Sequence, residues 1–114
     1  MSVNVSTRMN GDVLIADLKG RLTLGESTDK FRTALTGWID QGRRKVLLNL
    51  AEVDFIDSSG LGELVRSYTT LANQGGKLKL LKLQAKVRDL MQITKLVTVF
   101  EVYDNEMAAV LSFE

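Results

Sequence analysis

Two strand-like segments begin the chain, residues 3–9 and 13–19, with Asn10 and Gly11 between them. An Asn-Gly pair favours a two-residue hairpin turn, because both residue types tolerate a positive φ angle. In the second segment apolar residues occupy both alternating faces. This pattern predicts a strand that is buried on both sides of its sheet.

Helix-like and strand-like segments alternate through the rest of the chain. Apolar residues spaced three and four apart predict a helix that ends near Gly42, with Ser27 as its candidate N-cap. The same reasoning predicts a buried strand at 46–50, a helix at 59–73, a strand at 77–83, a helix at 86–94, a strand at 97–103 and a last helix capped by Asp104 or Asn105. Helical spacing places three large side chains in the core: Trp38, Met91 and Met107.

The element order β-β-α-β-α-β-α-β-α predicts the fold class. Strands that alternate with helices form a mostly parallel sheet through right-handed crossovers, and the initial hairpin adds an antiparallel edge. We therefore expect a single α/β domain over residues 1–114, with a mixed, mostly parallel sheet and about four helices.

The composition excludes several classes of function. The 114 residues include no Cys and no His, which excludes a disulfide framework, a thiolate zinc site and a Ser-His-Asp triad. Lys and Arg number 15 against 14 acidic residues, so the charge balance points to neither nucleic acid nor an anionic membrane as a partner. No apolar run approaches the roughly 20 residues that span a bilayer, and residues 1–10 lack the apolar core of a signal peptide. We expect a cytoplasmic protein.

The functional surface of such a fold is expected where strands pass into helices, which here means the loops at 20–27 and 51–62. The second loop follows a buried strand, opens a helix and contains the run Asp57, Ser58, Ser59, Gly60, Leu61, Gly62. Asp and Ser are favoured N-cap residues, and a phosphate on a hydroxyl here would meet the positive end of the helix dipole. Gly60 and Gly62 leave little bulk in the first turn, so a partner's backbone can approach closely. An ordinary capped helix has the same pattern, and both interpretations remain open.

This run, preceded by Asn49-Leu50 and Phe55-Ile56, resembles the signature of the bacterial anti-sigma-factor antagonists. These proteins belong to the STAS domain family, which is shared with sulphate transporters. The likeness extends along nearly the whole chain, since residues 20–22 resemble the family's loop after the second strand and residues 73–78 resemble its turn into the next strand.

The resemblance implies a phosphorylation switch. Ser58 matches the residue that is phosphorylated by a partner anti-sigma factor with serine kinase activity, while Ser59 helps to form the helix start. The unphosphorylated antagonist binds the anti-sigma factor, and the sigma factor is released. The phosphorylated antagonist dissociates from the anti-sigma factor, and a PP2C-type phosphatase removes the phosphate. The partner-binding residues implied are Thr23, Asp57, Ser58, Ser59, Gly60, Leu61 and Gly62. No cofactor is implied for this chain, because ATP and a divalent metal belong to the partner enzymes.

Thr23 departs from the family pattern, because many antagonists carry an Asp there that contributes to partner contact. Thr23 is a plain loop hydroxyl, a partner contact or a second acceptor. Asp54 and Asp57 have no further oxygen ligands near them in sequence, so no metal site is expected.

Two other functions compete with the switch. The first is a STAS interaction module in another signalling or transport complex, without sigma control. The second is a serine hydrolase that uses Ser58 or Ser59, which the missing His and the lack of a Lys in the motif disfavour.

Overall fold

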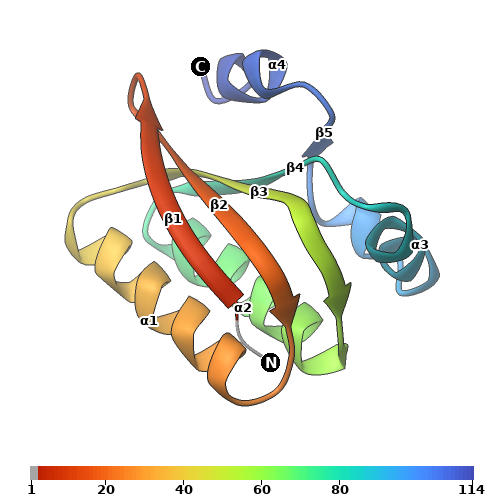
Figure 1. Cartoon of the computed structure of the whole chain (residues 1–114). Helices are drawn as coiled ribbons and strands as arrows, with labels where there is room; N and C mark the ends of the chain where they lie inside the picture. Colours follow the sequence, from red (N-terminus) through yellow and green to blue (C-terminus); the bar gives the residue numbers. More distant parts are fainter. Residues whose placement is uncertain (1–2) are drawn as a thin grey trace.

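Five strands form one sheet in the order β1-β2-β3-β4-β5 in the computed structural model, which describes residues 3–114 (Figure 1). The first pair is antiparallel and the remaining pairs are parallel. The strands are β1 (Val3–Asn10), β2 (Val13–Leu22), β3 (Lys45–Ile56), β4 (Lys77–Leu81) and β5 (Val102–Tyr103). The helices are α1 (Glu26–Asp40), α2 (Ser58–Asn73), α3 (Ala85–Ile93), the 3₁₀ turn η1 (Leu96–Thr98) and α4 (Glu106–Leu111). The predicted fold class and element order are confirmed.

Helices cover both faces of the sheet (Figure 1). Successive right-handed crossovers in one direction place α1, α2 and α3 against the same face, where their side chains share the larger core. The last helix, α4, covers part of the other face, and Ala109 and Phe113 pack there on a smaller core. The strand β2 contributes Leu14 and Leu18 to the larger core and Ile15 to the smaller one, which confirms that it is buried on both sides.

The hairpin turn lies one residue later than predicted. Asn10 pairs with Val13 across the two strands, so the turn residues are Gly11 and Asp12. Gly11 has a φ of 61°, whereas Asn10 extends the β1 ladder. The pairing of Asn10 leaves only the glycine to supply a positive φ angle.

The strand predicted at 97–103 is wrong over most of its length. Leu96–Thr98 form a 3₁₀ turn, and only Val102–Tyr103 pair with β4. The ring of Phe100 is buried and packs edge-to-face on Tyr68 of α2, with 5.4 Å between ring centroids. This long-range packing overrides the local strand propensity of a β-branched segment.

The three large side chains assigned to the core have different outcomes. Trp38 and Met91 are buried, as predicted. Met107 is 71% exposed, because α4 has only six residues and turns its Ala109 side toward the sheet. Among residues 3–114, no helix is both long enough and apolar enough to cross a membrane.

Candidate functional site

The structure brings together the loop that follows β2 and the junction of β3 with α2. The loop predicted at 51–62 is wrong, because β3 runs to Ile56 and α2 begins at Ser58, which leaves Asp57 alone between them. These strands are parallel neighbours, and their last residues, Leu22 and Ile56, are paired in register. The N–H of Asp57 donates to the carbonyl oxygen of Leu22 at 3.3 Å, which continues the contact beyond the strands. The start of α2 therefore lies beside the loop that leads into α1.

Asp57 joins the start of α2 to the loop before α1 through a single carboxylate. It is the N-cap of α2, and its Oδ1 accepts the N–H of Gly60 at 2.8 Å. Its Oδ2 accepts the N–H of Leu24, at the tip of the neighbouring loop, at 3.0 Å. The capping role follows from the sequence. The second bond spans 33 residues, and no local sequence pattern indicates it.

These hydrogen bonds lower the pKa of Asp57. The N–H of Leu24 is the largest cause, and the N–H of Gly60 is the next. Both N–H groups favour the ionised carboxylate, since a protonated oxygen accepts them less well. Asp57 is consequently a structural anion at the helix start, where it is already bonded on both oxygens.

We expect Asp57→Ala to lower the free energy of unfolding by about 1–2 kcal/mol at neutral pH, because the N-cap bond and the bond to Leu24 are both lost. Because the pKa of Asp57 is lower in the folded state, its ionised carboxylate stabilises the fold at pH values above the unfolded-state pKa of about 3.9. This stability is lost as the pH falls through the folded-state pKa. Urea unfolding at pH 7 and in acid measures the difference from wild type, which should shrink in acid. Asp54→Ala is the control, because Asp54 is exposed and forms a single long ion pair. Equal losses in the two variants would contradict the bridging role.

Ser58 is the first residue of α2, and it is exposed. Its hydroxyl is accessible to a second protein without any movement of the core. Ser59, the next residue, is half-buried. The exposure of the two residues thus distinguishes Ser58 as the more accessible hydroxyl.

Gly60 is buried, and it serves the packing of this chain. A Cβ atom at Gly60 would clash with the carbonyl oxygen of Leu22 and would lie 2.8 Å from Cγ2 of Ile56. The close approach that Gly60 permits is therefore between α2 and the end of β2. This corrects the expectation that Gly60 opens the helix start to a partner's backbone.

Gly62 and Leu61 occupy opposite environments. Gly62 is exposed, and a Cβ there would meet no atom within 4 Å. Leu61 is 6% exposed and belongs to the larger core. Of the glycines in the motif, only Gly62 presents an open surface next to Ser58.

Ser27 holds the Thr23 loop. The Ser27 hydroxyl accepts the N–H of Thr23 at 2.7 Å and donates to the Thr23 carbonyl at 2.8 Å. The predicted N-cap role of Ser27 is wrong, because α1 begins at Glu26 after Gly25 and has no side-chain cap. Thr23 is half-buried, and the loop instead exposes the neighbouring Leu24, which is 77% exposed.

Glu63 ties the beginning of α2 to α1. Its buried carboxylate accepts the Arg32 side chain of α1 at 2.7 Å and the Arg66 side chain at 3.2 Å. Paired in this way, a buried carboxylate is satisfied on both oxygens. The ion pairs help to position α2, and with it Ser58, against the neighbouring helix.

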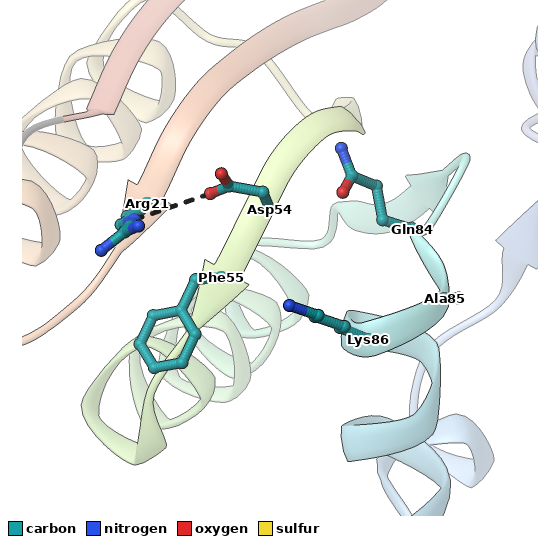
Figure 2. A pocket seen from close by; sticks show the side chains of 6 residues that line it. All are labelled: Arg21, Asp54, Phe55, Gln84, Ala85 and Lys86. Atoms are coloured by element: carbon teal, nitrogen blue, oxygen red, sulfur yellow. Dashed lines mark ion pairs between the residues drawn. The ribbon is translucent and has the colours of Figure 1, made fainter.

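A notch of about 330 Å³ lies beside the site, between β3 and the start of α3 (Figure 2). Its lining residues are Arg21, Asp54, Phe55, Gln84, Ala85 and Lys86. Phe55 is 47% exposed, and the Arg21 guanidinium lies 5.9 Å from the centroid of its ring. No local sequence pattern indicates this notch, because its residues come from three separate elements.

The described residues contain no cluster of three or more His, Cys, Asp or Glu side chains that would hold a metal ion. Asp57 directs both its carboxylate oxygens to backbone N–H groups, and Asp54 pairs with Arg21 at 3.8 Å. The chemistry available at the site is that of an exposed hydroxyl at a helix start.

The sequence model of the STAS domain matches residues 4–109. This chain belongs to the STAS domain family. The match covers the whole site and all of the strands except the first residue of β1.

Two relatives of this STAS domain are anti-sigma factor antagonists. The anti-sigma F factor antagonist of Paenibacillus polymyxa is 27% identical over 115 residues, which cover 100% of this chain and 97% of the relative. The anti-sigma-B factor antagonist of Bacillus subtilis (strain 168) is 28% identical over 102 residues, which cover 90% of this chain and 92% of the relative.

A solved structure with the same fold is that of the Bacillus cell fate determinant SpoIIAA in its phosphorylated form. It matches this STAS domain with a TM-score of 0.73 at 21% identity, and the match covers 97% of this chain and 100% of that chain. The arrangement of sheet and helices is thus common to both proteins.

Proposed function

We propose that this STAS domain is an anti-sigma-factor antagonist switched by phosphorylation of Ser58. In its unphosphorylated form it binds an anti-sigma factor that is also a serine kinase, and the sigma factor is released. The phosphorylated form dissociates from the anti-sigma factor, and a PP2C-type phosphatase in the cytoplasm restores the unphosphorylated form. The observation that carries the proposal is the exposed Ser58 at the first position of α2, next to the exposed tip of a second loop.

The names of the relatives support the partner, and the site supports the acceptor. Both relatives described above are anti-sigma factor antagonists. SpoIIAA, which has the same fold, exists in a phosphorylated form. In this chain the exposed contacts for a partner are Ser58, Gly62 and Leu24, while Gly60 and Leu61 support them from beneath.

Phosphorylation acts on binding through charge. A phosphate adds about −1.5 to −2 charge, next to the Asp57 carboxylate. Asp57 already accepts the N–H of Gly60, so that donor is not free to bind the phosphate. A partner surface that fits a neutral hydroxyl then faces two neighbouring anions, whereas the fold beneath them keeps its hydrogen bonds.

The phosphorylation site is tested with the histidine-kinase-like anti-sigma factor encoded in the same genome. After incubation with ATP and Mg²⁺, intact-mass measurement is expected to show the addition of a single phosphate to wild type. Peptide mapping should place it on Ser58, and Ser59→Ala should be modified as wild type is. Modification that persists in Ser58→Ala would refute the assignment. If no kinase of this type binds or modifies wild type, an interaction module without sigma control becomes the better interpretation.

A further inference from the structure

The notch next to Ser58 combines an exposed aromatic ring with two cationic side chains. Figure 2 shows Phe55 between Arg21 and Lys86, which come from β2 and from the first turn of α3. Arg21 is paired with Asp54 at a distance of 3.8 Å, which is long for an ion pair. Among the ion pairs of residues 3–114, none involves Lys86. An exposed aromatic ring flanked by incompletely neutralised cations is typical of an interaction surface.

The notch is preformed. The Gln84 side chain, at the N-cap position of α3, donates to the carbonyl oxygen of Ala51 in β3 at 2.8 Å. This bond fixes the start of α3 against β3 and therefore sets the width of the opening. A partner does not need to order the notch before it binds, which reduces the entropic cost of association.

The notch and Ser58 belong to one edge of the sheet. The strands β2, β3 and β4 are adjacent and parallel, so the helices that follow them begin in the same order along their carboxyl ends. The start of α2 is thus flanked by the start of α1 on one side and the start of α3 on the other. Phe55 precedes Ser58 by a short stretch of chain that turns from β3 into α2.

The charges along this edge are polarised. The first turn of α1 carries Glu26 and Asp29, and the first turns of α2 and α3 carry no acidic residue. Lys86, in the first turn of α3, lies at the opposite end of the edge, and Arg21, near the end of β2, lines the notch with it. Ser58 lies between an acidic flank and a basic flank, so the edge distinguishes the two orientations of a docked partner.

We infer that the notch binds an acidic side chain of the anti-sigma factor, next to an apolar side chain that covers Phe55. This inference rests on the proposed function and adds the orientation of the complex to it. The partner's carboxylate lies between the Arg21 guanidinium and the Lys86 ammonium. The interaction holds the partner in the one orientation that presents Ser58 to the bound ATP of the kinase.

The test is calorimetric titration of the same anti-sigma factor with unphosphorylated protein. Lys86→Glu, Arg21→Glu and Phe55→Ala should each raise the Kd by about 10-fold or more, since each removes or reverses a central contact. Lys77→Glu is the matched control, because Lys77 is an exposed lysine at the opposite end of β4, and it should change the Kd by less than about 2-fold. Melting curves confirm that all four variants are folded.

Phosphorylation kinetics provide a second measurement. Lys86→Glu should raise the KM of the kinase for this substrate and leave kcat at saturation close to wild type, because the hydroxyl itself is unchanged. Replacing the partner's contacting acid with Lys should restore binding to Lys86→Glu. A Kd for Lys86→Glu equal to that of Lys77→Glu would overturn the inference while the phosphorylation of Ser58 stands. Failure of wild type to bind would instead overturn the proposed function, and the inference with it.

Discussion

Phosphorylation of Ser58 is expected to weaken binding to the anti-sigma factor by about 30-fold to several-thousand-fold. An unpaired charge buried at an interface costs about 2–5 kcal/mol, which corresponds to that range in Kd. Ser58 is exposed at the start of α2, and the neighbouring Asp57 carboxylate already occupies the N–H of Gly60. The added phosphate therefore brings charge to the interface, and the N–H of Gly60 does not form a compensating hydrogen bond with it.

Variants of Ser58 should reproduce parts of this effect. Ser58→Asp carries one negative charge on a shorter side chain, so its Kd should lie between those of wild type and the phosphoprotein. Ser58→Ala should bind as wild type does and resist the switch. Calorimetric titration of one partner preparation with all four forms makes the comparison.

The control for charge alone is Thr69→Asp on the same helix. Thr69 is exposed, and it lies about 16 Å along the helix axis from Ser58, beyond the Debye length of about 8 Å at physiological salt. We expect its Kd to stay close to wild type. If the phosphoprotein binds as tightly as wild type, the antagonist mechanism fails, and a partner that reads the phosphate through arginine side chains explains the site better.

Gly60→Ala should lower the free energy of unfolding by about 2 kcal/mol or more, whereas Gly62→Ala should raise it by about 0.5–1 kcal/mol. A Cβ at Gly60 clashes with the backbone carbonyl of Leu22, which cannot move without displacing the end of β2. A Cβ at Gly62 meets open space, so the higher helix propensity of alanine is what changes the free energy of unfolding.

Thermal unfolding of the two variants and wild type provides the measurement. For a domain near this size, 1 kcal/mol corresponds to about 4–8 °C in Tm. Gly60→Ala should therefore melt about 10 °C below wild type, and Gly62→Ala a few degrees above it. Equal melting temperatures for the two alanine variants would show that α2 does not approach β2 as closely as described.

The sequence alone determined the elements whose signals are local. Apolar residues on both faces of β2 predict its burial on both sides. Gly42 follows the end of α1 with a φ of 84°. Asp57 and Asn105 cap α2 and α4, as their residue types indicate. Periodicity and capping depend on residues within about one helical turn of each other, which is why they can be found without a structure.

The tertiary structure alone decided how the site is built. Asp57 bonds Leu24, Gly60 faces Leu22, and Phe55 lies in a notch with side chains from other elements. Each of these contacts joins residues that are brought together only by the parallel pairing of β2 with β3 or by the packing of α3. The same cause explains the error at residues 97–103, where a local strand preference lost to the burial of Phe100. A motif in the sequence thus located Ser58, and the packing of distant segments determined which of its neighbours are exposed to a partner.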